Sequence, residues 1–267
     1  MALDEAIASL VKKDGIRPAL RLYGWDGPSL SLGCFQDAAD LDIAYCRARH
    51  IPIVRRPTGG RAILHGDELT YSLSARTDCK PFSGGLLDSY RRISSAFSLA
   101  FRKIGVVAEA KGERERGRVL AGSPLCFQSS SYGEILVNRK KVVGSAQKRW
   151  NDCLLQQGSI PYSYDEEAVR GIFGAEKFTA LRDCTVGLKE VVPDLDEEEF
   201  RQIVAACFEE AFGVSLSPAL PSPEELALAG ELEREKYLQD HWNLQRQSRP
   251  SRQGEAGSFL SPSRNNS

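Results

Sequence analysis

Apolar and polar positions along the chain follow two periods, which separate helical from extended segments. A spacing of three and four residues predicts helices over residues 2–13, 37–49, 87–104, 165–173, 196–212 and 223–238. The widest apolar stripe belongs to residues 87–104, where Tyr90, Ile93, Phe97 and Phe101 contribute to one broad face. This segment is therefore the strongest helix prediction in the sequence.

Short runs rich in apolar residues and bounded by turn signals predict strands. They cover residues 20–25, 29–32, 51–56, 61–64, 69–75, 134–137, 141–145 and 154–160. The turn Asn138-Arg139-Lys140 joins two of them as a hairpin. Strands come first and helices later, which predicts an α+β domain with a mixed, largely antiparallel sheet flanked by helices. We expect this domain to span residues 1–245, followed by a disordered tail rich in Ser, Arg, Pro, Gly and Asn over 246–267.

Charge and cysteine content narrow the class of protein. The 267 residues include 35 basic and 36 acidic side chains, so the net charge is −1 and no overall basic field attracts nucleic acid. The seven cysteines form no Cys-x-x-Cys pair, which disfavours both a secreted disulfide framework and a zinc site. No secretory signal opens the chain, and no apolar run approaches the roughly 20 residues of a membrane helix. We expect a cytoplasmic protein with no metal, no membrane and no nucleic-acid partner.

Residues 55–65 (RRPTGGRAILH) combine a proline-locked turn, two adjacent glycines and three arginines directly after an apolar strand. Gly59 and Gly60 lack a β-carbon, so the backbone can approach a ligand and adopt positive φ. Arg56 and its neighbours offer donors for a carboxylate, phosphate or phosphopantetheine group. The spacing fits neither a P-loop nor a dinucleotide-binding motif. From spacing alone, a ligand-cradling loop and a plain tight turn are equally supported.

Two other segments contain reactive side chains. Cys126 lies in SPLCF (123–127), and Lys141 opens the second hairpin strand and leads into Gly144, Ser145 and Ala146. A single cysteine among seven is more often a buried small hydrophobe, and a lysine at a hairpin tip is more often solvated. Lys140 is assigned to solvent on that ground. A nucleophilic cysteine needs a neighbouring cation, which Lys141 could supply.

Three aromatic or imidazole side chains also have two interpretations. His65 is more often a structural residue of a turn than a base, and a Cys–His dyad through it is the less favoured alternative. Tyr23 and Trp25 alternate on a predicted strand, which is more typical of a core or a pocket wall than of catalysis.

Taken together and in this order, these segments resemble the lipoate–protein ligase and octanoyltransferase family, whose catalytic fold is also that of biotin protein ligases. The matching strings are RRPTGGRAILHGDELTYS (55–72), SPLCF (123–127), VNRKKVVGSAQKR (137–149) and LLQQGSI (154–160). RLYGWDGPSLSLGCFQ (21–36) and the opening MALDEA are also similar. The resemblance covers roughly residues 1–245, so it identifies this domain as catalytic. Relatives usually carry a strand before MALDEA; either the start lies upstream or an edge strand is absent.

The Cys126 motif is most similar to that of the cysteine-dependent octanoyltransferases of Gram-positive type. That resemblance implies catalytic roles for Cys126 and Lys141. It also implies a substrate-binding set formed by Tyr23, Arg56, Thr58, Gly59, Gly60, His65, Gly144, Ser145 and Ala146. The implied donor is octanoyl-acyl carrier protein, and the implied acceptor is an apo lipoyl domain or glycine-cleavage H protein. No cofactor is implied for this reaction. The segment Ser131-Tyr132-Gly133-Glu134 departs from the family's aromatic Trp-Tyr-Glu, which leaves the acyl-chain preference open.

Three alternatives remain open from the sequence. An ATP-dependent lipoate–protein ligase shares the fold and would need ATP and Mg, but it would tolerate loss of Cys126. An amidotransferase that moves lipoyl or octanoyl groups between carrier proteins would also use an acyl-cysteine. A catalytically silent relative would bind lipoyl domains without turnover.

Overall fold

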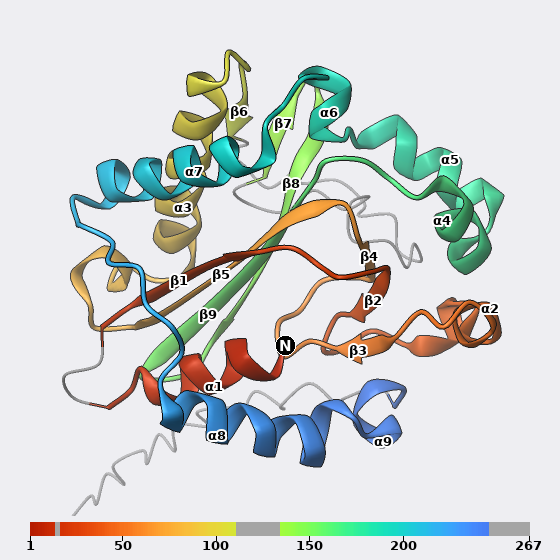
Figure 1. Cartoon of the computed structure of the whole chain (residues 1–267), viewed down its shortest axis with the longest axis horizontal. Coiled ribbons are helices and arrows are strands. Elements are labelled where there is room, and N and C mark those ends of the chain that lie inside the picture. The colour runs from red at the N-terminus through yellow and green to blue at the C-terminus, as the bar shows by residue number, and fades with distance from the viewer. Residues whose placement is uncertain (14–16, 111–133, 246–267) are drawn as a thin grey trace, which may run out of the picture.

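The computed structural model describes residues 1–13, 17–110 and 134–245. A six-stranded antiparallel sheet in the order β1-β5-β9-β8-β7-β6 runs through its centre. Its strands are β1 (Ala19–Tyr23), β5 (Glu68–Arg76), β6 (Glu109–Ala110), β7 (Ile135–Val137), β8 (Lys140–Arg149) and β9 (Cys153–Pro161). Figure 1 shows β5, β8 and β9 as the long strands that cross the molecule.

A smaller three-stranded sheet lies beside the first, in the order β3-β2-β4. Its strands are β2 (Ser29–Leu32), β3 (Ile53–Arg55) and β4 (Ile63–His65). β2 is parallel to β3 and antiparallel to β4, so the fold contains both kinds of pairing. The predicted α+β class with a mixed, largely antiparallel sheet is confirmed.

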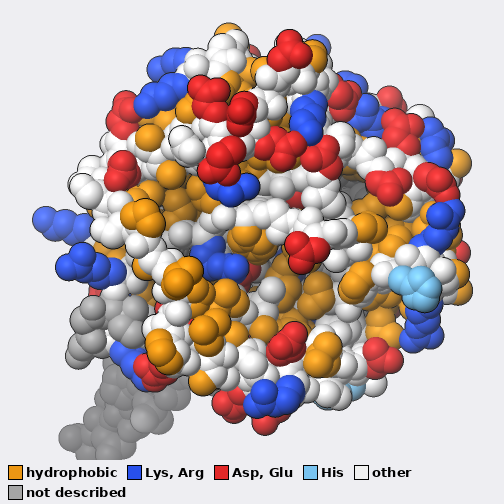
Figure 2. Space-filling view, viewed as in Figure 1, with side chains coloured by type: hydrophobic (Ala, Val, Ile, Leu, Met, Phe, Trp, Pro, Cys, Tyr) orange, Lys and Arg blue, Asp and Glu red, His pale blue; other side chains and the backbone are white. Residues whose placement is uncertain are grey.

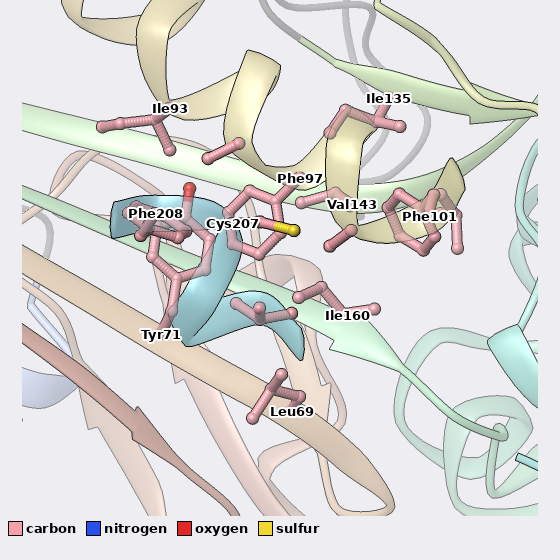
Figure 3. Close-up of a cluster of buried hydrophobic side chains, with 14 of the residues drawn as sticks. Leu69, Tyr71, Ile93, Phe97, Phe101, Ile135, Val143, Ile160, Cys207 and Phe208 are labelled. Carbon is pink, nitrogen blue, oxygen red and sulfur yellow. The ribbon is translucent and has the colours of Figure 1, made fainter. Parts of the chain in front are cut away.

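Two helices cover one face of the six-stranded sheet and enclose the larger core. α3 (Leu86–Lys103) packs against α7 (Glu197–Phe212), as Figure 1 shows at upper left. Phe97 lies at the centre of this core, with its ring centroid 4.7 Å from that of Tyr71 and 5.2 Å from that of Phe208. Figure 3 shows these three rings converging with aliphatic side chains from β5, β8 and β9. The stripe that predicted the helix over 87–104 is therefore the face that covers the sheet.

A second core lies under the three-stranded sheet. It is formed by β2 and β4 with α2 (Ile43–Ala48), α4 (Glu166–Phe173) and α5 (Ala175–Cys184). The short helix α6 (Leu188–Val191) follows α5. On the other side of the molecule, α1 (Ala2–Leu10) contacts β5 and β9 and packs against α8 (Pro223–Leu232). A π-helical turn, Glu233–Tyr237, then leads to α9 (Asp240–Asn243), which reaches β3.

Several predicted elements differ in their bounds for identifiable local reasons. The helix predicted over 37–49 is divided into a 3₁₀ turn, Ala38–Asp40, and α2. Asp42 causes the division, because its side chain accepts a hydrogen bond from the Tyr45 amide and caps a new helix. The predicted helix over 223–238 changes from α to π winding at Glu233.

The hairpin before the long strand β8 has a two-residue turn. Asn138 and Arg139 both have positive φ, 50° and 65°, as the tightest hairpin turns require. In the part of the chain that the structure describes, no helix is long and apolar enough to cross a membrane. The tail predicted over residues 246–267 lies outside the described residues.

Candidate active site

A narrow cavity of about 20 Å³ lies between the two sheets. β4 supplies Ile63 and His65 on one side, with Arg56 from the loop that follows β3. The six-stranded sheet supplies the remaining strand residues, namely Tyr23, Thr70, Gly144, Ser145, Ala146, Gln157, Gly158 and Ser159. The cavity is therefore a small slot bordered by both sheets.

Missing side chains create the floor of this slot. A β-carbon on Gly158 would lie 2.1 Å from Tyr71 Cε1 and 2.8 Å from the Gly144 carbonyl oxygen. Only glycine therefore allows the Tyr71 ring to lie against β9 at this point. The Tyr71 hydroxyl is 2.7 Å from Ser145 Oγ and accepts a hydrogen bond from Gln156 Nε2. Burial raises the pKa of Tyr71 to about 12, so the hydroxyl remains neutral.

A fully buried carboxylate, Asp4, organises one end of the cavity. It accepts hydrogen bonds from the Tyr23 hydroxyl at 2.9 Å and from Gln157 Nε2 at 2.8 Å, and Ser72 and Arg21 also donate to it. Gln157 Oε1 in turn accepts a hydrogen bond from Thr58 at 3.0 Å. Burial and the Asp4 charge raise the pKa of Tyr23 well above its usual value. Asp4 thus connects α1, a cavity wall and the glycine loop through one chain of hydrogen bonds.

A second buried carboxylate, Glu68, fixes His65. Its Oε1 lies 2.8 Å from His65 Nδ1, and Ser159 Oγ donates to its Oε2 at 2.8 Å. The His65 ring also stacks on Trp25, with centroids 4.2 Å apart. Burial alone would raise the pKa of Glu68, but the His65 charge and the hydrogen bonds outweigh burial and lower it.

Ser31, His65 and Glu68 have the connectivity of a nucleophilic triad, yet Ser31 lacks the access that a nucleophile needs. Ser31 Oγ is 2.7 Å from His65 Nε2, but Ser31 is 0% exposed and does not line the cavity. Arg56 Nη1 also donates to Ser31 Oγ at 3.0 Å. Both ring nitrogens of His65 are thus engaged by described side chains. A Cys–His dyad would have to displace one of these contacts.

The two adjacent arginines hold the glycine loop in shape. Arg56 donates to the carbonyl oxygens of Gly59 and Arg61, within its own loop. Arg55 donates to the carbonyl oxygens of Gly33, Gln36 and Trp242. These hydrogen bonds satisfy most of the buried donors of Arg56 and Arg55, which are 3% and 0% exposed, but Arg55 Nη2 is buried without a hydrogen-bond partner in the described part of the chain. Whether Arg56 also contacts a substrate stays a prediction.

Lys141 lies at the start of β8, three residues before the cavity-lining segment. Its Nζ donates to Glu134 Oε1 at 2.7 Å, and the two side chains are only 4% and 6% exposed. It is therefore not the solvated lysine that is usual at a hairpin tip. Lys140, which was assigned to solvent, is half-buried and donates to the Arg182 carbonyl oxygen, so that assignment was wrong. Cys126 lies outside the described residues.

A wider cavity adjoins the narrow one at His65. Its acidic lining consists of Asp67, Glu68, Asp165 and Glu197. Figure 2 shows acidic side chains gathered on the upper half of this face, where α7 begins with Glu197, Glu198 and Glu199. Lys189 pairs with both Asp67 and Glu197, which offsets part of this negative charge.

The structure brings together most of the residues in the predicted substrate-binding set. Tyr23, Arg56, His65 and the segment 144–146 border one cavity. Thr58, Gly59 and Gly60 lie on the adjoining loop, where Thr58 contacts the cavity residue Gln157 and Gly60 has φ 92°.

Sequence reasoning missed several polar residues around the site. These are Asp4, Ser31, Glu68, Gln157, Ser159 and Glu134. One signal for some of them was available. The strands β5 and β9 are buried along almost their whole length, and polar residues on such strands need polar partners.

The fold and cavity define an α+β domain with a small slot between its two sheets and a buried lysine on one of the strands that line the slot. Comparison with known proteins gives a specific assignment. The sequence matches the lipoyl protein ligase A/B catalytic domain over residues 1–209, so the chain belongs to that family. The family predicted from the motifs is confirmed.

Named relatives and solved structures agree with this assignment. The chain is 37% identical to octanoyltransferase LipM of Kyrpidia tusciae, over 92% of this chain and 94% of that protein. It is also 37% identical to octanoyltransferase LipM of Exiguobacterium sp., over 91% and 92%. In fold it is similar to a lipoate-protein ligase A bound with ATP, with TM-score 0.76, 24% identity and coverage of 91% and 92%. A bipartite lipoate protein ligase studied with its E2 lipoyl domain from Thermoplasma acidophilum also aligns, with TM-score 0.76, 22% identity and coverage of 92% of each chain.

Proposed function

We propose that this protein is an octanoyltransferase of lipoate biosynthesis that forms an acyl-enzyme on Cys126. The acyltransferase class predicted from the motifs is confirmed by the octanoyltransferase relatives, which align over nearly the whole chain. The structural observation that carries the proposal is the position of the buried Lys141 on β8. That strand continues directly into the wall of the narrow cavity at Gly144.

Each part of the cavity has a role in this proposal. The slot between the sheets receives the octanoyl chain, and Gly158 lets the Tyr71 ring pack against β9 beside the slot. The loop that contains Thr58, Gly59 and Gly60 closes one side. Its shape depends on Arg56 and on the Thr58–Gln157 hydrogen bond. The resemblance of the Cys126 motif to that of cysteine-dependent octanoyltransferases supports Cys126 as the nucleophile.

The chemistry is two successive acyl transfers. The Cys126 thiolate attacks the thioester carbon of octanoyl-acyl carrier protein; a new C–S bond forms, and the carrier's sulfur leaves and takes a proton from Lys141. The amine of an acceptor lysine then attacks the acyl-cysteine, and an amide forms. Cys126 leaves as thiolate, and the proton lost by the amine returns to Lys141. Protons balance over the cycle, and the thioester supplies the driving force without ATP or a metal.

The acceptor that we propose is a lysine of an apo lipoyl domain, such as the glycine-cleavage H protein. An acceptor of this kind is consistent with the family, because one structural neighbour was solved in a study that includes its E2 lipoyl domain. The wider acidic cavity beside His65 adjoins the acyl slot.

Intact mass of the acceptor tests the proposal directly. An apo lipoyl carrier incubated with this protein and octanoyl-acyl carrier protein, without ATP, should gain one octanoyl group. Cys126→Ser should abolish both this gain and the acyl-enzyme. Lys141→Ala should slow acylation strongly while the protein stays folded, as its melting temperature will show. Cys184→Ser is the matched control, because burial raises the pKa of Cys184 although it lies within the electrostatic reach of Lys141. Modification that requires ATP and free lipoate, and that survives Cys126→Ser, would instead identify a ligase.

A further inference from the structure

The buried partner of Lys141 has no role in the proposed reaction so far. Glu134 immediately precedes β7, and its carboxylate lies 2.7 Å from Lys141 Nζ. Both side chains are at least nine-tenths buried. A buried ion pair costs desolvation free energy that its attraction only partly offsets, so it is a poor device for stability alone. A buried, hydrogen-bonded charge pair on a strand that leads into a cavity is therefore a candidate for a functional role.

The backbone around Lys141 is built to fix the side chain's direction. Between β7 and β8 the register shifts: Ile135 pairs with Val143, whereas Leu136 pairs with Lys141. β8 therefore has one extra residue there, a bulge of the kind that redirects a side chain. On its other side, the Lys141 carbonyl oxygen accepts a hydrogen bond from the Val186 amide at 3.1 Å.

We propose that Glu134 is a positioning residue whose carboxylate holds the Lys141 side chain and directs it for acyl transfer. This inference rests on the proposed function. A neighbouring carboxylate favours the charged form of a buried amine, and a charge-assisted hydrogen bond fixes its direction. Lys141 therefore begins the cycle as a cation that stabilises the Cys126 thiolate, rather than as a free base.

In the balanced cycle this sets the direction of each proton transfer. The ammonium gives its proton to the departing carrier thiolate, while Glu134 remains a carboxylate. The resulting amine is the acceptor for the proton that the incoming lysine loses. The Glu134 charge then favours return of Lys141 to the ammonium form.

The pH profile distinguishes this role from simple packing. Glu134→Gln has nearly the same shape but no charge, so Lys141 should lose its proton at lower pH and the thiolate should form at lower pH. Both limbs of the acylation profile should then move toward acid, by roughly 1 to 3 pH units. The rate at the wild-type optimum should fall at least about tenfold, which corresponds to about 1.4 kcal/mol. Glu134→Asp keeps the charge and should restore much of the wild-type profile.

The experiment measures two quantities across pH for wild type, Glu134→Gln and Glu134→Asp. One is the rate of acyl-enzyme formation by intact mass, and the other is the rate of iodoacetamide alkylation of Cys126 by peptide mass. Glu109→Gln is the matched control, because Glu109 is exposed and pairs across the same small sheet edge with Leu136. A fourth variant, Lys141→Ala with Glu134→Gln, should acylate no more slowly than Lys141→Ala alone.

The outcomes are separable. A Glu134→Gln protein with unshifted profiles for both reactions, or a slower enzyme whose profile stays in place, would overturn the positioning role. Additive losses in the double variant would do the same. If wild type forms no acyl-enzyme, the proposed function fails, but the alkylation profiles still decide whether Glu134 acts on the Lys141–Cys126 pair. Should Glu134→Gln fail to fold, Glu134→Asp and the double variant carry the test.

Discussion

The two sheets that border the cavity are held by different interactions. The six-stranded sheet, which carries Lys141, is covered by α3 and α7 through an aromatic core centred on Phe97. The three-stranded sheet has its own apolar core, but the edge facing the cavity is held by buried hydrogen bonds to distant segments. The position of the six-stranded sheet therefore depends mainly on apolar burial. The position of the three-stranded sheet's cavity edge depends on the charge and geometry of its hydrogen-bond partners.

The largest loss of stability should follow damage to the aromatic core. Phe97→Ala would remove a ring that contacts Tyr71 and Phe208, and it should lower the free energy of unfolding by about 3–5 kcal/mol. Leu87→Ala is the matched control on the same helix, because Leu87 is 51% exposed and should change stability by less than about 0.5 kcal/mol. Denaturant titration gives both values, and equal effects would show that this core does not hold the sheet.

The second-largest loss of stability should follow substitution of Glu68, the carboxylate that links the two sheets. Glu68→Gln weakens hydrogen bonds to His65 and Ser159, so we expect a loss of about 1.5–3 kcal/mol at neutral pH. Because the folded-state pKa of Glu68 is lowered, its contribution is present above its ordinary value and is lost as pH falls through the folded value. Urea titrations from pH 7 to pH 3 should therefore show the gap between variant and wild type closing toward acid. A gap independent of pH would contradict the assignment of an ionised Glu68.

A similar or smaller loss should follow crowding of the glycine loop. A β-carbon on Gly33 would lie 1.9 Å from the Gly60 carbonyl oxygen, so Gly33→Ala must displace the loop at a cost of about 1–3 kcal/mol. The rate of acyl-enzyme formation should fall by a larger factor than this loss of stability alone would cause, because the loop borders the cavity. At Gly27 a β-carbon meets nothing within 4 Å, which makes Gly27→Ala the control. Equal acylation by the two variants would show that the loop position does not matter.

The smallest loss of stability should follow removal of the hydrogen bond between β3 and α9. Asn243→Ala leaves the Arg55 amide without its side-chain acceptor, which should cost about 1 kcal/mol. The apparent KM for the acyl donor should rise while kcat changes little, since the loop's anchor is loosened without touching Lys141. His241→Ala, an exposed change on the same helix, should leave KM unchanged.

The family, the fold class and half of the residues that line the cavity could be predicted from the sequence, because they belong to contiguous strings. Gly144, Ser145 and Ala146 follow Lys141 directly, and Tyr23 lies in a strand of clear alternation. The same contiguous strings led to the prediction of octanoyl transfer, which agrees with the names of the relatives. The roles of Cys126 and Lys141 stay predictions until they are measured.

What could not be predicted depends on contacts between distant positions. Glu134 and Lys141 meet beside a register shift between β7 and β8, and Asp4 reaches Gln157 across 153 residues of chain. The helix α5 was also missed, since its apolar residues Phe178 and Leu181 are too few to show a clear period. The break at Asp42 was visible as a capping residue, but a continuous apolar period concealed it.

The contact between Arg55 and α9 has a consequence for the timing of synthesis. The Arg55 amide and the Asn243 side chain are separated by 188 positions. The end of β3 and the loop that follows it therefore cannot acquire this anchor until residue 243 has left the ribosome. At roughly 5–20 residues per second, that interval lasts roughly 10–40 s after residue 55 is made. A nascent chain therefore lacks this anchor for most of its translation, which delays the finished cavity until almost the whole described chain is present.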